Sequence, residues 1–182
     1  SLAGFTRVPQ QFFPASDRLE VLVDMRLPEG SSFEATAAEV ARLEALLAAQ
    51  PGVTSYAAYT GTGTPRFFLA FAPELDQPNY AQVVINTAGF PEREALLRTL
   101  TATMDRGDFP DVRLRPSRLE LGPPVGYPVQ FRVTGPDSAQ LRVIAADVQR
   151  AMRGSPALRN VGTSWGQMGK QAVIVLDQDK AR

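Results

Sequence analysis

The stretch RLELGPPVGYPVQFRV, residues 118–133, decides how this chain is divided. Both of its ends alternate apolar and polar residues, as β-strands do, whereas its centre holds Pro123, Pro124 and Pro128 together with two glycines. Proline has no backbone N–H to donate to a central strand, so a sheet must end before this segment. We predict a stiff connector between a complete module and the beginning of another; a proline-punctuated loop inside one domain is the alternative.

Two strand–helix–strand units are predicted before the connector. The first helix begins at a capping box formed by Ser31 and Glu34, and it ends near Gln50 because Pro51 and the next glycine cannot continue it. Pro91 suits the first turn of the second helix. Alternation of apolar and polar residues predicts strands over residues 19–27, 53–59, 66–72, 80–87 and 111–121.

A third unit is predicted after the connector. Residues 129–133 read as a strand, and Asp137 with Gln140 forms a second capping box. Strands are also expected over residues 158–165 and 171–177. Between the strands at 129–133 and 158–165, a helix is predicted by an apolar stripe at helical spacing, made by Leu141, Ile144, Val148 and Met152.

Two such units make a complete ferredoxin-like βαββαβ sandwich of the α+β class, with helices on one face of the sheet. We therefore expect an extended lead-in over residues 1–18, a ferredoxin-like module over 19–121 and an incomplete second βαβ module over 122–182. A lone βαβ unit cannot cover both faces of its strands. The third unit is therefore expected to need a partner outside this chain. We accordingly expect this chain to be a piece of a larger protein.

Composition excludes several kinds of function. The 182 residues include 19 basic and 19 acidic side chains, so the chain has no net positive charge that would attract nucleic acid. Cysteine and histidine are absent, which removes thiolate nucleophiles, imidazole bases and the usual zinc and haem ligands. No phosphate-cradling loop occurs, and no apolar run is long enough to cross a bilayer. We expect a soluble segment without enzymatic activity, metal site or cofactor.

Several passages together resemble the resistance–nodulation–division (RND) superfamily, in particular AcrB-like, acriflavin-resistance-type efflux pumps. They are FFPASDR at 12–18, LPEGSSFEAT at 27–36, the passage from PGV to TGTGTPRFF at 51–68, the proline-rich stretch above, and DQDKAR at 177–182. None is diagnostic alone, but their order and spacing are specific. The resemblance implies the second large periplasmic loop, with a complete first porter subdomain and the first part of a second.

The resemblance also implies the setting of the full protein. It would be a proton-driven homotrimer on the periplasmic face of the inner membrane, exporting small molecules with a periplasmic adaptor and an outer-membrane channel. A multidrug exporter is the function implied. The alternative is a stand-alone ferredoxin-like ligand-binding or regulatory domain; a small phosphatase-like enzyme on the same architecture is disfavoured by the missing histidine and phosphate loop.

Two groups of residues are candidates for contact with substrate. Arg113 and Arg115 lie opposite the apolar Val112 and Leu114 on one strand, and the resemblance places them beside a substrate cleft; a solvated sheet face is the alternative. Phe67, Phe68 and Trp165 are further cleft candidates, with a role in the core as the alternative. A glycine-rich turn lies where the resemblance places the switch loop of these pumps, but it lacks the phenylalanines often seen there, and a plain hairpin turn is the alternative; its residues are Thr60, Gly61, Thr62, Gly63, Thr64 and Pro65.

Overall fold

The computed structural model describes residues 17–67, 71–119, 127 and 129–166. This part of the chain contains β1 (Glu20–Arg26), α1 (Phe33–Ala48), β2 (Val53–Thr60), β3 (Tyr80–Thr87), α2 (Phe90–Asp105), β4 (Arg113–Arg118) and α3 (Ser138–Arg153).

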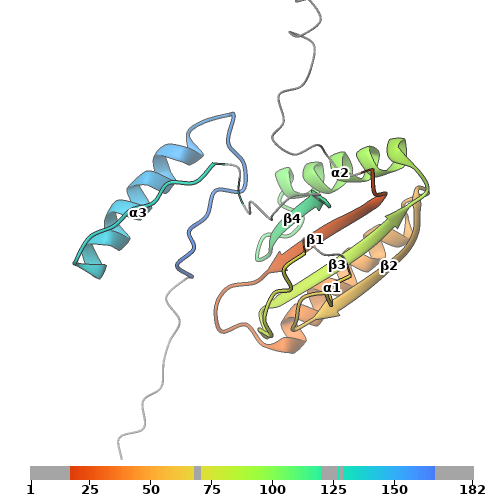
Figure 1. Ribbon diagram of the computed structural model, residues 1–182, viewed down its shortest axis with the longest axis horizontal. Coiled ribbons are helices and arrows are strands. Elements are labelled where there is room, and N and C mark those ends of the chain that lie inside the picture. Colours follow the sequence, from red (N-terminus) through yellow and green to blue (C-terminus); the bar gives the residue numbers. More distant parts are fainter. Residues whose placement is uncertain (1–16, 68–70, 120–126, 128, 167–182) are drawn as a thin grey trace, which may run out of the picture.

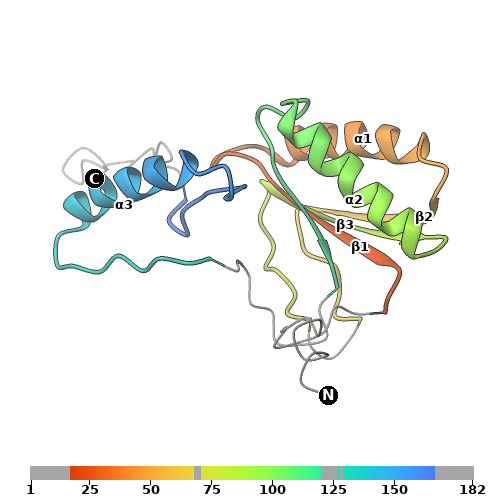
Figure 2. The same cartoon turned by 90° about the horizontal axis from the view of Figure 1, so that it is seen from above.

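The four strands form one sheet in the order β2-β3-β1-β4, and every neighbouring pair is antiparallel. Each of α1 and α2 connects two strands that are not neighbours, and both helices lie on the same face of the sheet (Figures 1 and 2). This strand order and the βαββαβ sequence of elements define a ferredoxin-like α+β module. The predicted fold class is confirmed.

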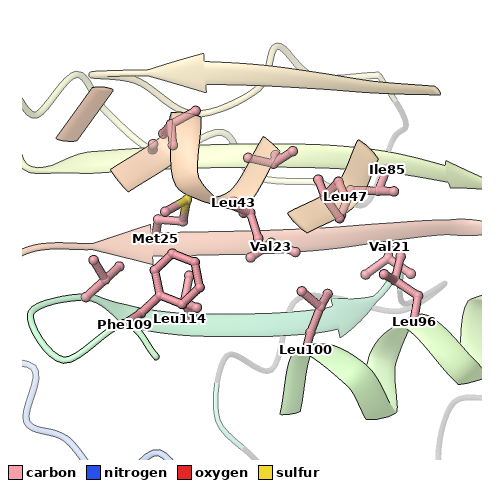
Figure 3. Packing of buried hydrophobic residues seen from close by; sticks show 14 of the residues in the cluster. Val21, Val23, Met25, Leu43, Leu47, Ile85, Leu96, Leu100, Phe109 and Leu114 are labelled. Atoms are coloured by element: carbon pink, nitrogen blue, oxygen red, sulfur yellow. The ribbon is translucent and has the colours of Figure 1, made fainter. Parts of the chain in front are cut away.

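The core lies between the sheet and the two helices (Figure 3). In β1, Val21, Val23 and Met25 alternate toward the helices and are completely buried. Leu43 of α1 and Leu100 of α2 pack against them from the helix layer. Burial of these side chains supplies the main stabilisation of the module, because each is worth about 1.5–3 kcal/mol relative to exposure.

The helix starts agree with the sequence except at α1. Its N-cap is Ser32, whose hydroxyl accepts from the backbone N–H of Ala35, so the predicted box on Ser31 was wrong by one residue. The carboxylate of Glu34 accepts from its own backbone N–H and from the Ser32 hydroxyl, which lowers the pKa of Glu34. Asp137 caps α3 as predicted, accepting from two backbone N–H groups of the first turn.

Three predicted strands are not formed. Residues 66–67 and 71–72 belong to the long connection between β2 and β3, and residues 129–133 and 158–165 follow irregular paths. Their apolar and polar residues alternate, but an antiparallel partner is needed to hold such a pattern in a sheet. The predicted strand at 171–177 lies outside the described residues.

Helix α3 lies apart from the sheet in both views (Figures 1 and 2). No residue of α3 is buried, and Ile144 in its apolar stripe is 42% exposed. The helix thus has a core-type pattern with no core against it in the described part of the chain.

Candidate functional site

The face of the sheet opposite the helices is the candidate site. Side chains on this face come from alternate positions of each strand, including Leu22 and Asp24 of β1 and Gln82 and Val84 of β3. The described residues of the connection between β2 and β3, 61–67 and 71–79, cover part of it. Phe71 from this connection packs with Leu22, Leu119 and Val84 in a second, smaller apolar cluster.

A hollow of about 220 Å³ remains between this connection and strands β2 and β3. It is open to solvent on one side, and its lining combines aromatic, aliphatic, hydroxyl and amide groups. The lining residues are Ser55, Tyr56, Ala57, Tyr59, Thr64, Pro65, Phe67, Val84 and Asn86. Pockets of this composition bind organic molecules by apolar contact, with a few polar groups to orient them.

The predicted glycine-rich turn forms one end of the hollow, since Thr64 and Pro65 belong to its lining. At the base of the turn, Gly61 has a φ of +77°, donates to the carbonyl of Tyr80 at 2.8 Å and accepts from the N–H of Gln77 at 2.9 Å. A Cβ on Gly63 would lie 2.8 Å from the backbone nitrogen of Glu74. The turn is therefore packed closely against the returning part of the same connection.

Several hydrogen-bonded polar side chains next to the hollow hold this turn at Thr64. Asp24 Oδ1 accepts from the Tyr80 hydroxyl and from Gln82 Nε2, each at 2.7 Å. Gln82 Oε1 in turn accepts from the backbone N–H of Thr64 at 2.8 Å. Burial and, after it, the charge of Asp24 raise the pKa of Tyr80, so its hydroxyl stays a donor to higher pH than that of an ordinary tyrosine.

Arg113 and Arg115 lie on the face opposite buried Leu114, as the period of the strand predicts. Both guanidinium groups lie over the ring of Tyr127, at 5.1 Å for Arg113 and 4.6 Å for Arg115. Arg115 also approaches Asp24, with 3.8 Å between NH1 and Oδ2. The structure therefore brings the two predicted arginines together and adds an aromatic side chain from the connector.

Arg113 makes a second set of contacts beyond the connector. Its Nε donates to Asn160 Oδ1 at 2.8 Å, and Asn160 Nδ2 donates to the carbonyl of Leu114 at 3.2 Å. Asn160 has a φ of +54°, a left-handed conformation that asparagine tolerates better than most residues. These bonds join β4 to the segment after α3.

The aromatic candidates are dispersed. Phe67 is 38% exposed and lines the hollow, with its ring centroid 5.4 Å from that of buried Phe71. Phe68 lies outside the described residues. Trp165 is 42% exposed and stacks with Arg142 of α3 at 4.9 Å, not with a residue that lines the hollow.

The sequence did not single out Asp24, Gln82, Tyr127 or Asn160. A signal existed for the first two, because polar residues inside otherwise apolar strands at 21–25 and 81–85 mark positions that need a hydrogen-bond partner. Tyr127 and Asn160 carried no comparable signal. Within the described ranges, no three acidic side chains come together as metal ligands would. None of the helices there has the length and apolarity that crossing a lipid bilayer requires.

Comparison with known proteins agrees with this architecture. Two crystal forms of a heavy metal efflux pump contain a similar fold. One has a TM-score of 0.58 at 15% identity and covers 87% of this chain, and the other has a TM-score of 0.56 at 17% identity and covers 80%. The chain spans only 17% and 16% of the length of those proteins. At such low identity the likeness shows the fold alone.

The fold is thus similar to that of a part of this heavy metal efflux pump. The model of the AcrB/AcrD/AcrF family matches residues 1–182, the entire sequence. The chain belongs to this family, and the resemblance to AcrB-like RND proteins is confirmed.

Proposed function

We propose that this chain is a periplasmic porter segment of a proton-driven RND multidrug efflux transporter. In this proposal it has no reaction of its own and contributes to the substrate access cleft and the export path. Membership of the AcrB/AcrD/AcrF family supports the assignment, as does the similar fold within a heavy metal efflux pump.

One observation supports a role of this segment in contact with substrate. In this module the helices cover one face of the sheet, while the other face keeps a hollow of about 220 Å³ with an aromatic lining. The hollow is open and lacks a deeply enclosing wall, which suits transient contact with substrates that must leave again. Arg113 and Arg115, on the same face of the sheet, add positive charge and hydrogen-bond donors that favour anionic groups.

We assign residues 19–121 to the first porter subdomain of the C-terminal half and residues 122–182 to the first part of the second. Between β4 and α3, the described residues 119, 127 and 129–137 contain no helix or strand, which supports this division, as does the apolar stripe of α3 without buried residues. In the full protein, which we propose to be a homotrimer with an adaptor and an outer-membrane channel, the remainder of the second subdomain would cover this stripe.

A stand-alone ligand-binding domain is the second candidate. It is favoured by one feature, because all residues lining the hollow come from the first module and a ligand could bind without any other domain. This candidate predicts that the isolated chain binds a small molecule with saturable affinity. The transporter predicts only weak binding to the isolated chain and export by the complete protein.

The transporter proposal is tested by filling the hollow. Ala57→Trp places an indole in it, and Ala38→Trp, at an exposed position of α1, is the matched control. The complete protein is expressed in cells lacking their own efflux pumps, and accumulation of a panel of dyes and antibiotics is measured. We expect Ala57→Trp to restore accumulation of part of the panel while Ala38→Trp exports normally. Absence of export by the unmodified protein for every compound contradicts the proposal.

The location is tested separately. The chain contains no cysteine, so Ser55→Cys introduces a single thiol into this segment. In intact cells with a permeable outer membrane, a membrane-impermeant maleimide should label this thiol. Labelling only after lysis contradicts a periplasmic position.

A further inference from the structure

Four residues form a row across the open face of the sheet, one from each strand. Tyr59 of β2 pairs with Gln82 of β3, Gln82 faces Asp24 of β1, and Asp24 faces Arg115 of β4. Cross-strand partners in an antiparallel sheet share a face and lie close enough for direct contact. The row thus places one carboxylate between an amide and a guanidinium.

The contacts in this row determine how the side chain of Gln82 is oriented. The Asp24 carboxylate only accepts hydrogen bonds, so the end of Gln82 that meets it must be the donating Nε2. The accepting Oε1 is therefore turned toward the backbone N–H of Thr64. The reverse orientation would set two acceptors against each other at one end and two donors at the other.

Thr64 depends on this bond because it is buried. Thr64 and Gln82 are each 2% exposed, so water does not readily replace either partner. A buried backbone N–H without an acceptor costs about 1–3 kcal/mol. At the base of the turn, Gly61 is held by backbone bonds, whereas the middle of the turn is held to the sheet by the side chain of Gln82.

We propose that Asp24 and Gln82 act as positioning residues that hold the glycine-rich turn, residues 60–65, onto the open face and thereby shape the hollow. Asp24 orients the amide of Gln82, and Gln82 anchors Thr64, which with Pro65 forms one end of the hollow. Gln82 itself does not line the hollow. Its effect on any ligand would therefore pass through the position of the turn.

The experiment uses the complete protein that carries this chain, with cysteines elsewhere removed. Thr64→Cys keeps the backbone N–H and places a thiol in the buried part of the turn. Thr103→Cys, at a position of α2 that is 1% exposed and faces the core, reports on unfolding of the whole module. Gln82→Met preserves length and approximate volume but removes both polar ends. The measured quantity is the maleimide labelling rate at residue 64 divided by that at residue 103.

We expect Gln82→Met to raise this ratio about tenfold, the factor that the loss of one buried hydrogen bond represents. Thr87→Val is the control on the same strand, because Thr87 is 4% exposed and its hydroxyl donates to the carbonyl of Leu19 at 2.7 Å and not to the turn, and it should leave the ratio unchanged. An unchanged ratio in Gln82→Met overturns the proposal, and so does a parallel rise at residues 64 and 103, because general unfolding would then account for the exposure.

A double-mutant cycle tests whether Asp24 acts through Gln82. Asp24→Ala alone should raise the ratio, since the amide of Gln82 is then free to rotate. Combined with Gln82→Met it should add no more than about twofold, because both changes break the same chain of contacts. If the two changes in the ratio multiply, Asp24 and Gln82 act independently, and the proposal that Asp24 acts through Gln82 is overturned. The labelling readout does not require transport, so its failure is distinct from failure of the proposed function.

Discussion

Arg118, at the end of β4, holds both carboxylate oxygens of Glu94 in α2. Arg118 Nε donates to Glu94 Oε1 at 2.9 Å, and its NH2 group pairs with Oε2. Arg93 of the same helix contacts Oε1 at 3.0 Å and donates from NH1 to the carbonyl of Arg18 at 2.7 Å. This group of charges joins the edge strand and the entry to β1 to the beginning of α2.

The ion pair predicts a specific loss of stability in acid. The hydrogen bonds from Arg118, and then from Arg93, lower the pKa of Glu94 from 4.5 to about 2. Because the folded-state pKa is depressed, the stabilisation is complete above pH 4.5 and is lost as the pH falls from there toward 2. The pair is partly exposed, so we expect a contribution of about 1 kcal/mol or less.

Urea unfolding of the chain at pH 6 and pH 3 measures this effect. The wild-type chain should lose more free energy of unfolding between the two pH values than Glu94→Gln, which lacks the titrating group. Arg118→Gln should behave like Glu94→Gln. Parallel losses in all three chains would contradict the assignment.

Truncation of an apolar side chain should cost far more free energy of unfolding in α1 than in α3. Leu43 is completely buried between the sheet and α1, so Leu43→Ala should lower the free energy of unfolding by about 2–5 kcal/mol. Ile144→Ala removes an exposed side chain of α3 and should change it by less than about 0.5 kcal/mol. Thermal unfolding monitored by circular dichroism checks both values. A large cost for Ile144→Ala would show that the α3 stripe is packed within this chain.

The space at Gly162 provides a test of whether the hydrogen bond between Arg113 and Asn160 stabilises the segment after α3. A Cβ at Gly162 would overlap Nη1 of Arg113, so Gly162→Ala must displace the guanidinium from Asn160. We expect faster tryptic cleavage after Arg159, by about tenfold, since a charge-assisted hydrogen bond worth roughly 1.5 kcal/mol or more is lost. Gly154→Ala is the control, because its added Cβ makes only an ordinary contact at 3.4 Å. Equal cleavage in both variants would contradict this role.

In the transporter that we propose, the positive charge of Arg115 should favour export of anionic compounds. Replacement by methionine removes the positive charge but keeps an unbranched side chain on the open face of the sheet. Export of anionic compounds should fall about two- to fivefold relative to neutral ones, the range expected for a solvent-accessible charge contact. Arg98→Met, on the exposed side of α2, is the control. An equal loss for anionic and neutral compounds would indicate a structural role for Arg115.

Much of the first module could be predicted from the sequence because its signals are local. Alternation in residues 20–26 and 80–87, the apolar spacing of α1 and α2, and the position of Pro91 depend on neighbours within a few residues. The face on which Arg113 and Arg115 lie follows from the same period of two. Strand prediction failed at residues 66–67 and 71–72, which belong to a connection between β2 and β3 that packs on the sheet through Phe71.

The ferredoxin-like class and the core pattern follow from the sequence, because apolar periodicity and helix caps are properties of adjacent residues, and the family follows from motifs that resemble those of AcrB-like pumps. That Asp24, Gln82 and Thr64 meet, and that two arginines lie over Tyr127, depends on the tertiary structure. These contacts join strands and loops far apart in the chain. Their partners are selected by sheet register and by the path of the connections, neither of which a local pattern records.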